Sequence, residues 1–174
     1  MGATHVIFKK GLMMSENNDS YLRIGKAHAD LDNGNVVALS GLVSGEDDLW
    51  TTAAVSDVTA EEVFIVDGDS SKILVDGKWA IDLNDIREFY TPSGKRVRLR
   101  KLAHGDSCYV SAAAFASTPT VGQYAVPANA ALTLAPAANL SGGTLVAFKV
   151  IKAHTFYVGG TSVAGYRLEC VVSK

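Results

Sequence analysis

The chain has 174 residues, of which 48% are hydrophobic and 20% are charged, and its formal net charge is −2. This composition excludes a disordered acidic or basic tail, because such tails are highly charged and poor in apolar residues. No run of about 18 apolar residues is present, so no membrane-spanning helix is predicted. The length fits one compact domain with an arm or a small lobe. Two cysteines, Cys108 and Cys170, cannot form a disulfide framework and favour folding in a reducing cytoplasm.

Hydrophobic residues recur mostly with the two-residue period of a β-strand. The runs predicted as strands are, in chain order, 62–66, 73–75, 95–101, 145–151, 155–158 and 166–172. Turn signals separate them at Asn33-Gly34, Asp67-Gly68-Asp69, Asp76-Gly77, Pro92-Ser93-Gly94, His104-Gly105-Asp106, Gly142-Gly143 and Gly159-Gly160. Only Leu83–Phe89 has a helical pattern. The sequence therefore predicts a mainly β fold, an antiparallel sandwich or barrel with one short helix and an extended N-terminal arm.

Three regions are expected along the chain. Residues 1–28 are predicted as the N-terminal arm and first strand, 29–110 as a β-rich core domain, and 111–174 as a β-rich C-terminal part that packs with the core. In the arm, the apolar run Val6, Ile7 and Phe8 could add a strand to the exposed sheet edge of a partner. The alternative is an ordinary first strand of the domain itself. If the run is such an arm, deleting residues 1–14 should weaken docking and leave the fold intact.

Charge is divided unevenly between the two halves of the chain. Residues 1–94 hold 16 acidic and 7 basic side chains (−9), and residues 95–174 hold 2 acidic and 9 basic ones (+7), which sum to −2. Neighbouring copies could set an acidic flank against a basic one, which would fix their register. Equally, both halves could neutralise each other within one chain.

No charged residue or histidine occurs between Ser107 and Phe148. A monomer rarely exposes such a long uncharged stretch. The segments Tyr124-Ala125-Val126 and Leu132-Thr133-Leu134 are expected in the core. The loops Ser117–Thr120 and Pro136–Asn139 are better candidates for an interface.

No catalytic, cofactor-binding or metal-binding residue is predicted. The string His104-Gly105-Asp106-Ser107 holds the residue types of a nucleophilic site, but neighbours on a turn and a strand cannot converge on one substrate atom. It is interpreted as a hairpin turn. Both cysteines lack the Cys-x-x-Cys partners of structural zinc and are expected as buried free thiols. The acidic turns Asp30–Gly34 and Asp67–Ser71 depart from the glycine spacing of a calcium loop, so both are interpreted as plain turns.

A basic strand is the strongest remaining candidate for binding. Arg96, Arg98 and Arg100 share one strand face, and Lys101 follows them. Three guanidinium groups in a row could follow a phosphate backbone. Strands that bind nucleic acid usually interleave aromatic residues, and here the intervening residues are aliphatic. The favoured interpretation is therefore a basic face that meets acidic residues, within or between chains, such as Glu61, Glu62, Asp67 or Asp69.

One half of the chain carries a series of short motifs in a recognisable order. They are Ala29-Asp30-Leu31-Asp32-Asn33-Gly34-Asn35-Val36-Val37, Gly41-Leu42-Val43-Ser44-Gly45-Glu46, Leu49-Trp50, Gly94-Lys95, Val97-Arg98-Leu99 and Gly105-Asp106. In this order, residues 29 to 110 resemble decoration (cement) proteins of tailed-bacteriophage heads. The flanking segments, 1–28 and 111–174, show no such resemblance.

The resemblance implies a non-enzymatic virion protein that is made in the host cytoplasm and binds the capsid exterior. Its partners would be the major capsid protein and further copies of itself, a trimer being one form. No membrane partner is expected, and nucleic acid is a less favoured partner. Val6, Ile7, Phe8, Arg96, Arg98, Arg100 and Lys101 are the candidate interface residues. The alternatives are another phage structural module (head-fibre base, tail or receptor-binding protein), a β-barrel nucleic-acid binder, and, with least support, a hydrolase built around His104 or Cys108.

Overall fold

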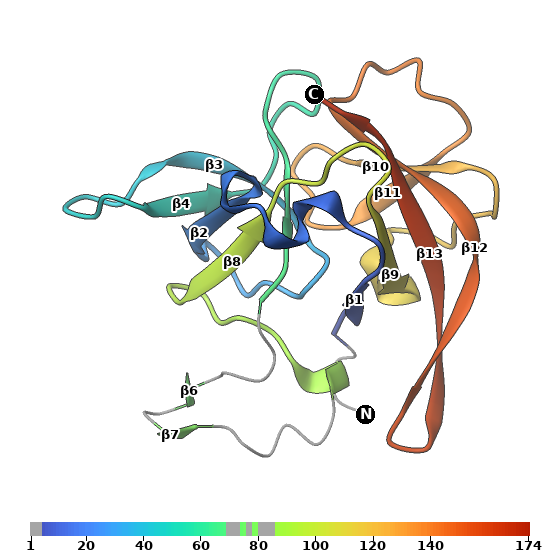
Figure 1. Ribbon diagram of the computed structural model, residues 1–174, viewed down its shortest axis with the longest axis horizontal. Helices are drawn as coiled ribbons and strands as arrows, with labels where there is room; N and C mark the ends of the chain where they lie inside the picture. The colour runs from blue at the N-terminus through green and yellow to red at the C-terminus, as the bar shows by residue number, and fades with distance from the viewer. Residues whose placement is uncertain (1–4, 69–73, 76–77, 80–85) are drawn as a thin grey trace.

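The computed structural model describes residues 5–68, 74–75, 78–79 and 86–174, and its main feature is a closed barrel beside an open sheet (Figure 1). The barrel consists of β2 (Leu22–Lys26), β3 (Val36–Leu42), β4 (Leu49–Ala53), β5 (Phe64–Val66) and β8 (Arg96–Arg100). The open sheet consists of β1 (Phe8–Lys10), β9 (Ser107–Ser111), β10 (Tyr124–Pro127), β11 (Leu134–Ala137), β12 (Val146–Val158) and β13 (Thr161–Ser173). β6 (Leu74–Val75) pairs with β7 (Lys78–Trp79). The mainly β prediction is confirmed.

The barrel strands follow the order β2-β4-β3-β5-β8 and close on β2. Four of the five pairs are antiparallel, and β2 runs parallel to β4. Gly25 makes this closure possible, because a Cβ there would lie 2.6 Å from the Thr52 side chain and 2.7 Å from that of Leu99. The interior is filled by Ala27, Leu31, Val37, Phe64, Val66, Val97 and Leu99.

The open sheet follows the order β1-β9-β13-β12-β10-β11, and all its pairs are antiparallel. The predicted strands 145–151 and 155–158 form one strand, β12, which pairs along its length with β13. Both strands of this hairpin extend beyond their neighbours (Figure 1). In β13, Leu168 and Cys170 are buried while Arg167 and Glu169 point to the other face, as the alternation predicts.

Alternation along two barrel strands explains why the barrel and the sheet pack together. Val37 and Phe64 point into the barrel, whereas their neighbours Val36 and Ile65 point outward. The outward side chains join a second core, formed with Val6, Phe8, Ala38, Val55, Val63, Leu102, Cys108, Val110, Ala114, Phe115, Ala125, Leu134, Val146, Phe148, Val150, Leu168 and Cys170. The barrel wall thus has an apolar surface on both sides, and its outer side packs against the inner face of the sheet.

The helices of the described part are single 3₁₀ turns. They are η1 (Met14–Asn17), η2 (Asp19–Tyr21), η3 (Ile86–Glu88) and η4 (Ala112–Ala114). The helix predicted over Leu83–Phe89 is described only from Ile86, where it is the 3₁₀ turn η3; residues 83–85 lie outside the described residues. No helix among the described residues has the length and apolar character needed to cross a membrane.

The two sheets do not follow the three predicted regions. β1 and β2 both come from residues 1–28, but β1 belongs to the open sheet and β2 to the barrel. β9 crosses the boundary between regions 29–110 and 111–174, and it joins the strands of the latter through its pairing with β13. Long-range pairing connects segments that a division by sequence position separates.

Candidate interaction surfaces

The basic strand β8 is neutralised by carboxylates of its own chain. Arg100 is 1% exposed and donates from Nε and Nη2 to Asp67 Oδ2, at 2.9 and 2.7 Å. Arg98 donates from Nε to the Asp67 carbonyl oxygen, and its Nη2 lies 3.4 Å from Asp67 Oδ2. Asp67 directly follows β5, which pairs with β8, so the two strands bring these groups together.

The remaining basic residues of this region form exposed ion pairs. Arg96 Nη2 lies 2.9 Å from Glu46 Oε1, and Lys101 Nζ lies 2.5 Å from Glu62 Oε1. The expected acidic neighbours Asp67 and Glu62 are therefore confirmed. Glu46 was missed because only the folding of the β3–β4 hairpin brings it to β8. Glu61 instead accepts hydrogen bonds from Ser56, and Asp69 lies outside the described residues.

The apolar run near the N-terminus is buried in its own chain. Val6, Ile7 and Phe8 are 3%, 2% and 8% exposed. β1 pairs with β9, Phe8 opposite Val110, which is the arrangement of an ordinary first strand. In this structure the run is not a free arm, and the exchange of β1 between chains remains a prediction.

The Leu31–Gly34 motif ties this first strand to the barrel. Asp32 accepts hydrogen bonds from the backbone N–H of Val6 (3.0 Å) and makes a 2.6 Å contact with His5 Nδ1. Asn33 exchanges two hydrogen bonds with the backbone of Gly68, while Gly34 adopts a φ of +91°. The side chains of Asp32 and Asn33 therefore hydrogen-bond to the backbone of the same chain and stabilise the fold, in agreement with the interpretation of this segment as a turn.

The residues of the His104–Ser107 string hold the chain segment that follows β1. Asp106 accepts hydrogen bonds from the backbone N–H groups of Met14 (2.6 Å) and Ala103 (2.9 Å), and Ser107 Oγ accepts one from Leu12. His104 is exposed on a turn that joins β8 of the barrel to β9 of the open sheet, so the turn is confirmed but it does not close a hairpin. His104 and Asp106 both line an open surface pocket beside Gly11–Met14, while Ser107 is not among its lining residues.

Both cysteines are buried free thiols, as predicted. Burial, with the charge of Asp106, raises the pKa of Cys170 to about 12, and burial also raises the pKa of Cys108. Within the described residues, no three histidine, cysteine or acidic side chains are grouped as metal ligands.

The uncharged stretch divides between the core and the surface. Ala125 and Leu134 are fully buried, which confirms the two expected core segments at these positions. Exposed small side chains are Ala112, Ala113, Ala116, Ser117, Thr118, Thr120, Asn129, Ala130, Ala138, Asn139 and Ser141. Val121 is also exposed, at 50%. Of the loop candidates, Ser117–Thr120 is exposed except for Pro119, which is buried. The candidate loop Pro136–Asn139 is a loop only in its second half, because Pro136 and Ala137 belong to β11 and are partly buried, whereas Ala138 and Asn139 are exposed.

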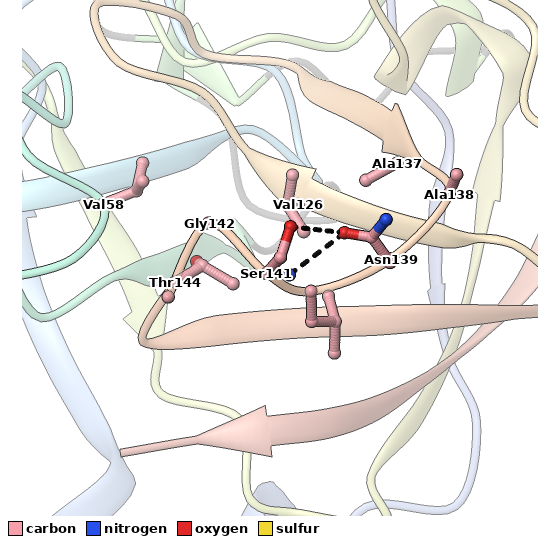
Figure 2. A pocket seen from close by; sticks show the side chains of 10 residues that line it. Val58, Val126, Ala137, Ala138, Asn139, Ser141, Gly142 and Thr144 are labelled. Atoms are coloured by element: carbon pink, nitrogen blue, oxygen red, sulfur yellow. Dashed lines mark hydrogen bonds between the residues drawn. The ribbon is translucent and has the colours of Figure 1, made fainter.

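An uncharged pocket of about 280 Å³ lies beside β10 and β11 (Figure 2). Its lining is Val58, Val126, Ala137, Ala138, Asn139, Leu140, Ser141, Gly142, Gly143 and Thr144. Asn139 Oδ1 accepts hydrogen bonds from Ser141 N (3.1 Å) and Ser141 Oγ (2.6 Å), which shapes the loop (Figure 2). The residues that line this pocket are apolar or polar and uncharged, and none of them is titratable.

Sequence reasoning missed a basic surface on the outer face of the open sheet. Strand register places Lys9 beside Tyr109, Tyr109 beside Arg167, and Arg167 beside Lys152. Lys149 lies on the same face of β12 and is 5.7 Å from the ring centre of Tyr124. We call Lys9, Tyr109, Lys149, Lys152 and Arg167 the basic face. No sequence signal could reveal it, because its residues come from three distant segments.

An acidic surface lies on the β3–β4 hairpin. Glu46, Asp47 and Asp48 are exposed in its turn, and Leu42, at the end of β3, is 50% exposed. We call Leu42–Asp48 the acidic tip. Figure 1 shows it at the left end of the molecule, with the open sheet at the right.

Comparisons with protein-family models, curated proteins and solved structures found no match for the chain.

Proposed function

We propose that this chain is a non-enzymatic structural protein that binds the outer surface of a tailed-phage capsid and stabilises contacts between major capsid protein subunits. The proposal rests first on the resemblance of residues 29–110 to head decoration proteins. The single structural observation that favours it is the uncharged surface of residues 107–148, with its pocket beside β10 and β11.

Small uncharged side chains suit docking on a protein surface. Removing them from water leaves no unpaired charge, and short side chains lose little rotamer freedom on binding. The exposed part of this surface includes Ser117, Thr118 and Thr120 of the first candidate loop, Ala138 and Asn139 of the second, and Val121. On an icosahedral lattice many such contacts act together, so each copy can bind modestly while the shell gains much stability.

The test uses purified chain and undecorated heads of the phage that encodes it. After sedimentation, bound chain should saturate at a fixed ratio to the major capsid protein. Val121→Glu should reduce this occupancy, because a charge would be buried at the contact. The matched control Leu12→Glu changes a side chain that is 79% exposed outside the stretch, and should bind normally. Heads that retain no wild-type chain would refute the proposal.

A second candidate is a tail, fibre-base or receptor-binding protein. The observation that favours it is the β12–β13 hairpin, whose end lies beyond the neighbouring strands and presents Tyr157 at 83% exposure. Exposed tyrosine is a frequent anchor in recognition surfaces. Immunogold labelling of virions decides between head and tail.

A further inference from the structure

We propose that copies of this chain associate head to tail, with the acidic tip of one copy on the basic face of the next. Both surfaces are present on the same chain, and their charges are complementary. The inference concerns the isolated chain, so it stands or falls independently of capsid binding.

Two carboxylates of the acidic tip form no ion pair with the described residues, although Arg23 and Arg98 line the surface pocket beside them. Glu46 is paired with Arg96, but Asp47 and Asp48 have no ion pair within the described part of the chain. Two adjacent exposed carboxylates repel each other, so a cationic surface placed against them lowers their energy. Leu42 adds a half-exposed apolar side chain to the same tip.

The basic face carries positive charge that no carboxylate among the described residues pairs with. Arg167 and Lys152 lie directly opposite each other on β13 and β12, and like charges in that position destabilise a sheet. Among the described residues none of the four cations of the face has an ion-pair partner, and Glu169 is the acid nearest to them in the strand register. Arg167 Nε is buried and has no hydrogen-bond acceptor in the described part of the chain. An incoming carboxylate would supply the charge that this face lacks.

The positions of the two surfaces determine the kind of contact. The inner face of the open sheet packs on the barrel, so the basic face points away from it. The acidic tip lies at the opposite end of the longest axis of the molecule (Figure 1). Surfaces so far apart favour a heterologous contact over a two-fold one, and such contacts form a ring when the rotation closes and an open chain otherwise.

The experiment measures self-association of the purified full chain by sedimentation velocity. At about 0.1 mM protein and about 0.05 M salt the wild-type mass should exceed that of one chain, and at about 0.5 M salt it should fall, because salt screens charge pairs. Asp48→Lys and Lys152→Glu should each raise the dissociation constant about tenfold or more. The controls Asp57→Lys and Lys26→Glu make the same charge changes on exposed residues that do not line the pocket beside Asp47 and Asp48, and should associate as wild type.

Mixing the two test variants distinguishes the proposed contact from a general charge effect. Asp48→Lys keeps an intact basic face and Lys152→Glu keeps an intact acidic tip, so the mixture should form a heterodimer although each variant alone is monomeric. A mixture that stays monomeric, or a wild-type chain that is monomeric at low salt, overturns the proposal. An oligonucleotide bound by a monomeric wild-type chain but not by Lys152→Glu would identify nucleic acid as the occupant instead.

Discussion

Arg100 and Asp67 form an almost completely buried ion pair, with side chains 1% and 6% exposed and 2.7 Å between Nη2 and Oδ2. The pair joins the ends of β5 and β8 on the outer side of the barrel wall, where Ile65 lies opposite Arg100. On the same strand, Arg96 forms an ion pair whose side chains are 64% and 41% exposed. One strand therefore offers a buried and an exposed pair for comparison.

We expect Asp67→Ala to destabilise the fold by about 3 to 5 kcal/mol, because it leaves the Arg100 guanidinium charged and buried without its carboxylate. The matched control Glu46→Ala removes the partner of Arg96, whose charge water can solvate, and should cost less than about 1 kcal/mol. Urea unfolding followed by circular dichroism measures both. Equal losses for the two variants would contradict the assignment of Asp67 as a structural residue.

The first strand is expected to be required for folding. Phe8 is 8% exposed and packs in the core between barrel and sheet, so Phe8→Ala should destabilise the chain by about 3 to 5 kcal/mol. Leu12→Ala, at a side chain that is 79% exposed, is the control and should have little effect. By the same argument, deletion of residues 1–14 should unfold the protein, whereas a free arm would leave it folded. Thermal unfolding of the deletion variant separates these outcomes.

Gly165 should not tolerate a side chain. A Cβ at this position would overlap with Phe156 Cε2 and lie 2.5 Å from the Val110 carbonyl oxygen, so Gly165→Ala should cost about 1 to 3 kcal/mol. Gly142→Ala is the control, since nothing lies within 4 Å of its Cβ position. The melting temperatures of the two variants test this. An unchanged melting temperature for Gly165→Ala would mean that the β12–β13 hairpin is packed differently.

Sequence alternation predicted which way side chains face, because this depends only on the two-residue period of a strand. It placed Val97 and Leu99 on one face of the strand and Arg96, Arg98 and Arg100 on the other, and in the structure the first face lies inside the barrel. It could not predict that Arg100 is buried while Arg96 is exposed, although both share one face. That difference depends on what covers each end of β8, which is decided by contacts between segments distant in sequence.

The same limit explains the missed surfaces. Lys9, Arg167 and Lys152 become neighbours only through the pairing of β1 with β9 and of β13 with both β9 and β12. The charge difference between the two halves of the chain was visible in the sequence. Whether it would cancel within one chain was not, and the structure shows both effects: the arginines of β8 pair with Asp67 and with Glu46 of the acidic tip, while Asp47, Asp48 and the cations of the basic face have no ion pair among the described residues.

The two cysteines predict how stability depends on pH. Burial raises the pKa of both thiols, to about 12 for Cys170, while in the unfolded chain they ionise near their ordinary value of about 8.5. Above that value the unfolded state loses protons that the folded state keeps, so these thiols lower stability as pH rises. Their contribution is fully present below about pH 8. Urea unfolding between about pH 7 and 10 should therefore show decreasing stability, and Cys108→Ala should reduce the slope.

Thiol labelling tests the same burial by a separate route. Only the thiolate attacks a disulfide reagent, and a buried thiol with a raised pKa supplies almost none at pH 8. The native chain should therefore react slowly, with both cysteines modified rapidly once it is unfolded in urea. Because β9 and β13 bury Cys108 and Cys170 in adjacent strands, slow native labelling should proceed at one common rate, set by the opening of this part of the sheet. Fast labelling of one thiol in the native chain would show that its strand opens separately and would contradict this cooperative packing.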